Sequence, residues 1–208
     1  MGLRGLYAIA DADTLAGRNL LAAVAAAIDG GAALVQYRDK QSGPAQRAER
    51  ARTLVELGRG RGVPVIINDD IELARATGAA GVHLGDGDGD PAQARARLGG
   101  DAIIGVSCYD ELERARRGAA AGADYVAFGR MFPSPTKPEG PRPPHNILRR
   151  AREVTGLPVC AIGGITVDNA PKLIAAGADL LAVITDLFAA DDIAARAAQY
   201  RALFAQKD

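Results

Sequence analysis

Aromatic residues are scarce in this chain of 208 residues, making up 4% of it, and tryptophan is absent. Apolar residues nevertheless reach 48%, so alanine, valine, leucine and isoleucine must build the interior. The length suffices for one domain with a sizeable core and does not by itself demand two.

The chain also lacks a net charge, because 25 lysines and arginines balance 25 aspartates and glutamates. This balance excludes the broad positive surface typical of nucleic-acid-binding proteins, although a local basic cluster can still hold a small anion. No apolar run is long enough to span a membrane, and the N-terminal segment turns acidic too early for a signal peptide. We therefore expect a protein that binds neither nucleic acid nor membrane.

Cysteine is nearly absent as well. Cys108 and Cys160 are far apart in sequence and belong to no CxxC pair. We expect reduced thiols in a cytoplasmic protein, because disulfides are rare in reducing compartments. Each thiol is expected to be a small buried hydrophobe and not a nucleophile.

Eight short runs rich in β-branched residues or leucine recur along the chain. These predicted strands are Gly5–Ala10, Ala33–Tyr37, Pro64–Asn68, Gly81–Leu84, Ala102–Ser107, Asp124–Phe128, Pro158–Ile162 and Asp179–Ile184. The stretches between them have helical spacing and are Asn19–Asp29, Pro44–Gly60, Asp70–Thr77, Pro91–Leu98, Asp110–Ala121, His145–Thr155, Val167–Ala176 and Ala190–Phe204. This alternation favours a parallel sheet covered by helices.

A Gly-Ala pair recurs before every second predicted strand, at Gly31, Gly78, Gly122 and Gly177. Glycine permits the left-handed cap that ends a helix just before the chain turns into a strand. A repeat that keeps this phase through all the strands favours a closed barrel over an open doubly wound sheet. We predict an α/β fold, a single (β/α)8 TIM-barrel domain over residues 1–208.

In such barrels the functional groups lie at the carboxyl ends of the strands. The second predicted strand runs into Gln36, Arg38 and Lys40, which alternation places on one side of the strand. Three donors with two positive charges favour an anion site there over a solvated strand end with an ion pair.

Carboxylates follow the third and fourth predicted strands. Asp70 can cap the next helix, which leaves Asn68 and Asp69 for another role. Asp86 and Asp88 lie in a glycine-rich loop where the backbone can approach a ligand closely. Because Mg²⁺ typically uses one or two carboxylates, waters and substrate phosphates, carboxylates beside basic residues predict a magnesium ion here.

Prolines interrupt the segment after the sixth predicted strand, so that it can be neither helix nor sheet. Ser134, Thr136 and Lys137 lie between these prolines, and two hydroxyls and an ammonium suit a phosphate. Taken alone, the segment is equally consistent with a loop that only connects two elements. The bare glycines Gly163 and Gly164, with the loop after the eighth strand, are typical of a phosphate site built from backbone amides.

Two phosphate sites at one barrel mouth predict two phosphorylated groups held face to face. His83 is expected to be packed and hydrogen-bonded, with a direct catalytic role the less favoured alternative. The sequence has no Ser-His-Asp order and no lysine inside a strand that suggests a Schiff base. Both features count against covalent catalysis.

Motifs from the first strand to the last resemble the thiamine-phosphate synthase family. They are VQYRDK (Val35–Lys40), IND (Ile67–Asp69), GVHLG with Asp88 (Gly81–Asp88), IGVSCY (Ile104–Tyr109), FGRMFPSPTK (Phe128–Lys137), AIGGI (Ala161–Ile165) and AVIT (Ala182–Thr185). The match is specific as a set. It implies the joining of a hydroxymethylpyrimidine diphosphate to a thiazole monophosphate, with release of diphosphate, by a dissociative substitution that Mg²⁺ assists.

The resemblance also implies roles position by position. Residues that would bind the pyrimidine diphosphate are Gln36, Arg38, Asp39, Lys40, Asn68, Ser107 and Lys137. Residues that would bind the thiazole phosphate are Ser134, Pro135, Thr136, Gly164, Ile184 and Thr185. Asp69 and Asp88 would bind Mg²⁺, and the catalytic residues would be Lys40, Ser107 and Lys137.

Three positions depart from the family pattern. Asp86 stands where glutamine is usual, Arg130 where proline is common, and Asp186 where a small residue is usual. Asp86 would add negative charge beside the metal and change the affinity for it. None of the three removes a donor from either phosphate site.

Three other functions are alternatives to the synthase. They are a thiazole tautomerase on the same barrel, a non-catalytic sensor of phosphorylated ligands, and another phosphate-binding barrel enzyme such as an epimerase or aldolase. The presence of Lys40, Asp69, Asp88 and Lys137 together favours the synthase, because a tautomerase needs no diphosphate and metal set. The sequence does not fix the oligomeric state, and a homo-oligomer stays open.

Overall fold

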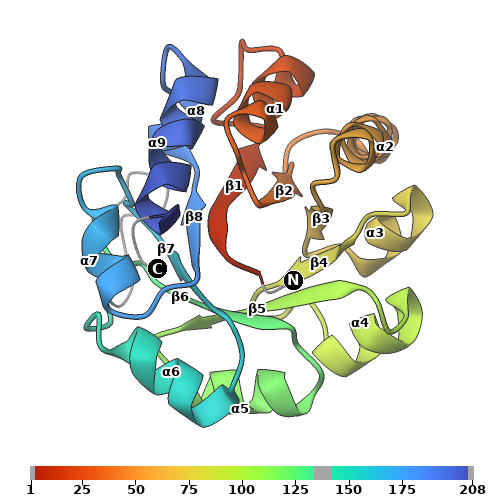
Figure 1. Cartoon of the computed structure of the whole chain (residues 1–208). Coiled ribbons are helices and arrows are strands. Elements are labelled where there is room, and N and C mark those ends of the chain that lie inside the picture. The colour runs from red at the N-terminus through yellow and green to blue at the C-terminus, as the bar shows by residue number, and fades with distance from the viewer. Residues whose placement is uncertain (1–2, 134–141, 206–208) are drawn as a thin grey trace.

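The computed structural model describes residues 3–133 and 142–205. Eight parallel strands close into a barrel in chain order, and Figure 1 shows them as a ring inside an outer ring of helices. The strands are β1 (Gly5–Asp11), β2 (Leu34–Arg38), β3 (Val65–Asn68), β4 (Gly81–Leu84), β5 (Ile103–Tyr109), β6 (Tyr125–Phe128), β7 (Val159–Ile162) and β8 (Leu180–Val183). The predicted (β/α)8 barrel is thus confirmed.

Eight of the nine helices in the described part of the chain follow the predicted ones, with small shifts at their ends. The nine described helices are α1 (Leu20–Asp29), α2 (Pro44–Arg61), α3 (Ile71–Thr77), α4 (Pro91–Leu98), α5 (Leu112–Ala120), α6 (Ile147–Thr155), α7 (Ala170–Ala175), α8 (Thr185–Phe188) and α9 (Ile193–Ala205). Helix α9 packs against α1 (Figure 1), which brings the last described helix beside the first.

One element differs from expectation. The eighth strand was predicted to reach Ile184, whereas β8 ends at Val183 and the short helix α8 follows at once. The helical turn places Leu187 and Phe188 in the core, where both are fully buried. Burial of these two side chains explains why the chain leaves the extended conformation there.

The strands separate two apolar layers, because successive side chains point to opposite faces of a strand. One layer fills the inside of the barrel with Tyr7, Ile9, Leu34, Ile66, Tyr125, Ala127, Cys160, Leu180 and Ala182. The other layer packs between barrel and helices and includes Val35 and Tyr37 from β2. Gln36 and Arg38 share the parity of Leu34, so both point to the inner side.

Gly105 on β5 makes room for an aromatic ring inside the barrel. A Cβ atom at this position would lie 2.0 Å from the ring carbon Cζ of Tyr125. Because real Cβ atoms essentially never approach another atom so closely, any larger residue would displace the phenol ring. The absence of a side chain at Gly105 therefore determines where the Tyr125 hydroxyl lies.

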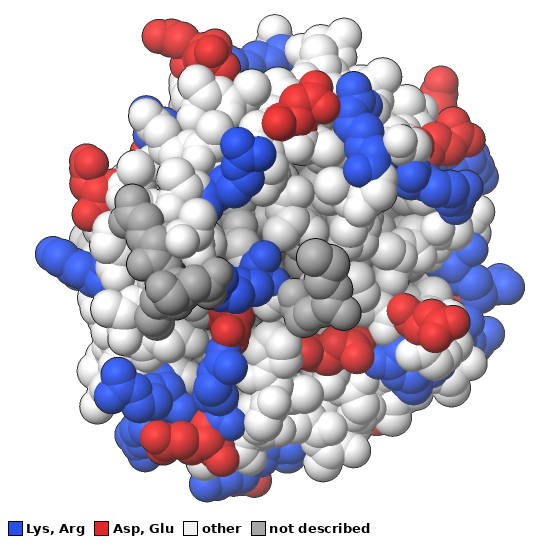
Figure 2. All heavy atoms as spheres, viewed as in Figure 1, with Lys and Arg blue, Asp and Glu red and all other residues white. Residues whose placement is uncertain are grey.

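The surface and the thiols agree with a compact barrel of balanced charge. Figure 2 shows lysine, arginine, aspartate and glutamate interspersed over the face in view. No helix in the described part of the chain is both long and apolar enough to cross a bilayer. Cys108 and Cys160 are free and buried, and burial raises the pKa of the Cys108 thiol to about 12. The prediction that both are small buried hydrophobes is confirmed.

Candidate active site

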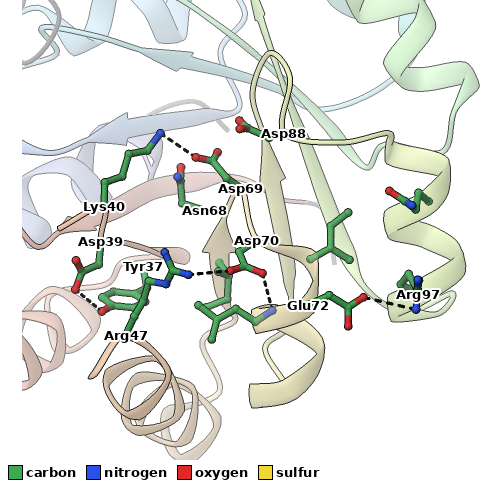
Figure 3. A pocket seen from close by; sticks show the side chains of 14 residues that line it. Tyr37, Asp39, Lys40, Arg47, Asn68, Asp69, Asp70, Glu72, Asp88 and Arg97 are labelled. Carbon is green, nitrogen blue, oxygen red and sulfur yellow. Dashed lines mark hydrogen bonds and ion pairs between the residues drawn. The ribbon is translucent and has the colours of Figure 1, made fainter. Parts of the chain in front are cut away.

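A cavity of about 670 Å³ opens where β2, β3 and β4 end (Figure 3). The predicted site residues that line it are Asp39, Lys40, Asn68, Asp69 and Asp88. They come from three segments that are far apart in the sequence, and closure of the barrel makes the strand ends neighbours. The cavity continues over the first turns of α3 and α4, where Glu72 and Gln93 line it.

An ion pair between Lys40 and Asp69 lies in the lining of this cavity. The Lys40 Nζ atom lies 3.0 Å from Asp69 Oδ2, and Figure 3 shows both side chains directed toward one another. About half of the Lys40 side chain, 53%, is exposed. Lys40 can therefore turn toward an anion in the cavity. Its partner Asp69 is itself partly exposed, so the move would not leave a fully buried charge unpaired.

A tight turn in the backbone carries Asp69 to this position. The φ angle of Asp69 is 65°, and the Asp70 N–H donates to the Asn68 carbonyl oxygen at 2.8 Å. This is a γ-turn with positive φ, a strained conformation that persists where the surrounding structure holds it. Asp70 then caps α3, accepting a hydrogen bond from the Leu73 N–H at 2.8 Å, as the sequence predicts.

Asp88 reaches the same cavity from the loop after β4. Its Oδ2 atom accepts a hydrogen bond from the Gly85 N–H at 2.9 Å. Burial raises the pKa of the Asp88 carboxyl, and the hydrogen bond and negative charge of Asp69 raise it further. Two carboxylates that face each other in this way favour either a shared proton or a bound cation.

The donor set fits Mg²⁺. Among the residues that the structure describes, no three His, Cys, Asp or Glu side chains form a metal-binding group. Mg²⁺ does not need one, because it uses one or two carboxylates and completes its shell with waters and substrate phosphates. Asp69 and Asp88 supply the two carboxylates, beside an open cavity that can admit a phosphorylated substrate.

Asp39 is tied into the protein beside Lys40. Its carboxylate accepts hydrogen bonds from the Tyr37 hydroxyl at 2.8 Å and the Ser42 N–H at 2.9 Å, and it pairs with Arg50 at 3.1 Å. Burial acts to raise the pKa of Asp39, but these hydrogen bonds outweigh it and hold the pKa well below its usual range. The binding role implied for Asp39 stays a prediction, and its contacts indicate that it anchors the loop that carries Lys40.

Replacing Asp39 by asparagine is expected to lower the free energy of unfolding by about 2 kcal/mol at neutral pH. Because the pKa of Asp39 is lower in the folded than in the unfolded state, its stabilisation is present above the unfolded-state pKa of about 3.9. It is lost as the pH falls from there toward the folded-state pKa. Urea unfolding of variant and wild type at pH 7 and pH 3 measures both values.

Asp29→Asn is the matched control for that experiment, because Asp29 forms an exposed ion pair with Arg61 at 3.0 Å. Exposed pairs contribute less than about 1 kcal/mol. A loss of stability in Asp39→Asn that is the same at both pH values would contradict the charge-dependent role.

Arg38 is oriented by a buried carboxylate on the neighbouring strand. The Arg38 guanidinium forms an ion pair with Asp11 at the end of β1. Asp11 is 2% exposed and also accepts a hydrogen bond from the Thr14 hydroxyl at 2.9 Å. Asp11 therefore positions Arg38 inside the barrel mouth, a role that its sequence context did not indicate.

Gln36 and Ser107 are joined through the inside of the barrel. The Gln36 amide nitrogen donates to the Tyr7 hydroxyl oxygen, and the Tyr7 and Tyr125 oxygens lie 2.9 Å apart. The Tyr125 oxygen is 2.8 Å from Nδ1 of His83, whose Nε2 is 2.9 Å from the Ser107 hydroxyl oxygen. The expectation that His83 is packed and hydrogen-bonded is confirmed. Sequence reasoning missed both tyrosines, for which inward strand parity was the available signal.

The unusual acidic residues Asp86 and Asp186 have basic partners. Arg114 Nη1 lies 2.6 Å from Asp86 Oδ1, and the same guanidinium stacks over the Tyr109 ring at 5.3 Å. Arg196 Nη1 lies 2.7 Å from Asp186 Oδ1. The negative charge of each residue is therefore compensated within the protein.

A second cavity, of about 260 Å³, lies between the ends of β7 and β8. Gly164, Ile184 and Thr185 line it, as the prediction for a second anion site requires. Gly164 has a φ angle of 63°, and a Cβ atom there would lie 2.2 Å from the Pro133 carbonyl oxygen, so only glycine fits. The Asn169 amide holds this loop by donating to the Gly164 carbonyl oxygen at 2.9 Å.

Four predicted site residues lie outside the described part of the chain. They are Ser134, Pro135, Thr136 and Lys137. Their implied roles stay predictions that come from the sequence alone.

Comparison with known proteins gives one consistent family. The family profile described as "Thiamine monophosphate synthase" matches residues 6–187. A thiamine-phosphate synthase from Azoarcus sp. (strain BH72) is 58% identical over 203 residues, which cover 98% of each chain. A thiamine-phosphate synthase from Aromatoleum aromaticum is 54% identical over 202 residues, which cover 97% of each chain.

Solved structures agree. A thiamine phosphate pyrophosphorylase from Pyrococcus furiosus superposes with a TM-score of 0.86 at 31% identity, covering 99% of this chain and 97% of that one. A 3-hexulose-6-phosphate synthase superposes with a TM-score of 0.69 at 20% identity, covering 96% of this chain and 99% of that one, and shares the fold alone.

Proposed function

Because this chain belongs to the thiamine monophosphate synthase family and is a transferase that makes thiamine phosphate, we propose that its reaction takes place where β2, β3 and β4 end. An aminopyrimidine that carries diphosphate on a methylene carbon meets a thiazole phosphate there. The bond from this carbon to diphosphate breaks first, and the thiazole nitrogen then bonds to the cationic carbon. The products are thiamine phosphate and diphosphate.

The observation that carries this proposal is the meeting of Lys40, Asp69 and Asp88 in one cavity. A departing diphosphate gains negative charge as its bond breaks, and a positive side chain beside it lowers the energy of that state. Mg²⁺, held by Asp69 and Asp88, would neutralise more of this charge and orient the diphosphate oxygens. No general base is required, because the thiazole nitrogen attacks with its lone pair and loses no proton.

Other residues of the pyrimidine site act by binding and orientation. Gln36 and Asn68 bind the ring and its substituents, and Arg38 directs a fixed positive charge at the anion. Ser107 donates a hydrogen bond to the diphosphate. Lys137, by resemblance to the family, adds a second ammonium to the departing group.

The phosphate group of the thiazole substrate occupies the cavity between β7 and β8. Backbone amides near Gly164, Ile184 and Thr185 are the donors that this phosphate needs. Ser134, Pro135 and Thr136 complete the site by resemblance. The pairing of Asp186 with Arg196 supports this assignment, because it compensates a negative charge in the lining of the cavity.

The partners of this protein are then two phosphorylated small molecules. We place the reaction in the cytoplasm, because free buried thiols at Cys108 and Cys160 suit a reducing compartment.

Mixing the purified protein with both phosphorylated precursors and Mg²⁺ is expected to yield thiamine phosphate and diphosphate in equal amounts. Chromatography of thiamine phosphate and an enzymatic assay for diphosphate measure the two products. Omission of either precursor, or a chelator in excess over Mg²⁺, should stop the reaction. Full turnover in the presence of the chelator would remove the metal from the mechanism, and no product under any condition would contradict the function.

A further inference from the structure

A chain of four hydrogen-bonded contacts crosses the inside of the barrel and connects Gln36 with Ser107. Its members come from five different strands. From Gln36 to Ser107, the hydrogen-bond chain passes through β2, β1, β6, β4 and β5. The two tyrosines in the middle of this hydrogen-bond chain are buried, since Tyr7 is 1% and Tyr125 is 0% exposed. Both ends of the chain are residues of the proposed pyrimidine diphosphate site.

The contacts give this chain a direction. The Gln36 amide nitrogen can only donate, so the Tyr7 oxygen accepts from it. Tyr7 has one hydroxyl hydrogen, for which the Tyr125 oxygen is the acceptor. If the Tyr125 hydrogen goes to Nδ1 of His83, a neutral imidazole carries its proton on Nε2 and can donate it to Ser107.

Burial makes it costly to reverse the link between the two phenols alone. Burial raises the pKa of Tyr7 and of Tyr125, so both phenols keep their hydrogens over the ordinary pH range. With Gln36 donating, a reversed link between the phenols would leave the Tyr7 hydrogen with no acceptor among the contacts that the structure gives it. An unpaired hydroxyl hydrogen in such an interior is strongly disfavoured.

We propose that Tyr7, Tyr125 and His83 are positioning residues, an inference that rests on the proposed function. They hold Gln36 with its amide oxygen toward the pyrimidine, and they hold Ser107 with its hydroxyl hydrogen toward the diphosphate. At one end the amide nitrogen is turned to Tyr7, which leaves the oxygen as an acceptor. At the other end the Ser107 oxygen accepts from His83, which leaves its hydrogen as a donor.

This arrangement selects an aminopyrimidine over an oxopyrimidine. The exocyclic amino group donates hydrogen bonds, and the Gln36 oxygen accepts one. An oxo group at the same position would place its oxygen opposite the Gln36 oxygen, and two acceptors cannot form a hydrogen bond. The hydrogen-bond chain couples the Gln36 amide to Ser107, because a turned amide would require every link as far as Ser107 to reverse. Diphosphate oxygens only accept, which suits the hydrogen that Ser107 offers.

The tautomer of His83 tests the direction without any substrate. The sequence has two histidines, so ¹⁵N spectra of the labelled wild type and of His145→Gln assign the His83 ring. We expect a protonated Nε2 and an unprotonated Nδ1. A proton on Nδ1, alone or together with one on Nε2, would overturn the proposal.

Substrate discrimination tests the consequence. In Tyr7→Phe and in Tyr125→Phe we expect the ratio of kcat/KM for the aminopyrimidine diphosphate to that for its 4-oxo analogue to fall about tenfold, the worth of one hydrogen bond. The KM for thiazole phosphate should not change. The double variant should show the same ratio as either single variant, since the loss of one hydroxyl already interrupts the hydrogen-bond chain that orients Gln36. Independent structural effects of the two substitutions would instead add.

Tyr200→Phe is the matched control. It also removes a buried phenolic hydroxyl, but this hydroxyl donates to Asp186 at 2.7 Å and makes no contact with the hydrogen-bond chain from Gln36 to Ser107. We expect it to keep the wild-type ratio. An unchanged ratio in both chain variants, with circular dichroism that shows them folded, would overturn the proposal, as would additive effects in the double variant.

These outcomes separate the two levels of inference. An active wild type whose chain variants keep the ratio contradicts the directed chain alone. A wild type that forms no thiamine phosphate contradicts the proposed function, and the His83 tautomer then supports or overturns the directed chain by itself. The same spectrum decides the matter if the phenylalanine variants do not fold.

Discussion

Asp69→Asn is expected to lower kcat about 10³-fold while leaving the barrel folded. The substitution removes one of the two carboxylates proposed to hold Mg²⁺, and charge stabilisation of this kind contributes several kcal/mol to catalysis, at 1.36 kcal/mol for each factor of ten. Asparagine is the suitable replacement because it tolerates the positive φ of 65° at this position as readily as aspartate does. Initial rates at saturating precursors, with circular dichroism for folding, measure the effect.

Binding of the metal itself provides a second measurement. Mn²⁺ titration followed by electron paramagnetic resonance, with diphosphate present, should show weaker binding in Asp69→Asn. Asp88→Asn should likewise shift the Mg²⁺ dependence of the rate to higher concentration, and if that titration is unaltered, Asp88 only caps its own loop. Asp29→Asn changes an exposed carboxylate of another ion pair and is expected to leave rate and titration as they are.

The second large effect is expected from Lys40→Ala, which should lower kcat about 10²-fold with a smaller change in KM. The charge on the diphosphate grows as its bond breaks, so an ammonium beside it stabilises the transition state more than the bound substrate. The Lys40 side chain is 53% exposed, so its loss leaves no cavity in the core. Steady-state kinetics with the pyrimidine diphosphate varied separate the two parameters.

Two further variants sharpen this test. Lys40→Arg keeps the charge and should restore part of the rate, although a planar guanidinium does not reproduce the geometry of an ammonium. Lys172→Ala removes an exposed lysine of α7 and is expected to have no effect. An equal loss in Lys172→Ala, or a rise of KM alone in Lys40→Ala, would contradict a role for Lys40 in the transition state.

Asp39 and Asp69 illustrate how similar residues came to differ. Both are aspartates next to a strand end and within six residues of a lysine or arginine in the sequence. In the structure the Asp39 carboxylate is held by Tyr37, Ser42 and Arg50 and its side chain is fully buried, whereas the Asp69 side chain is 24% exposed and pairs with Lys40. The difference comes from the direction in which the surrounding side chains and amides point, which the sequence does not give.

Local patterns were sufficient for the strands, most of the helices, the Asp70 cap and the burial of both cysteines. Alternation of apolar runs with amphipathic stretches depends on neighbouring residues alone, so it can be read along the chain. Helix α8 escaped prediction because four residues are too few for a helical period to emerge. Its helical state depends on the burial of Leu187 and Phe188.

From the amino-acid order alone one could derive a barrel of eight strands, the carboxyl ends at which its chemistry lies, and the charged residues that gather there. Only the folded chain shows that Asp11 holds Arg38 and that Tyr7, Tyr125 and His83 join Gln36 to Ser107. Hydrogen bonds depend on the direction and distance of both partners. Those partners stand on strands that become neighbours, or face each other across the interior, only when the barrel closes.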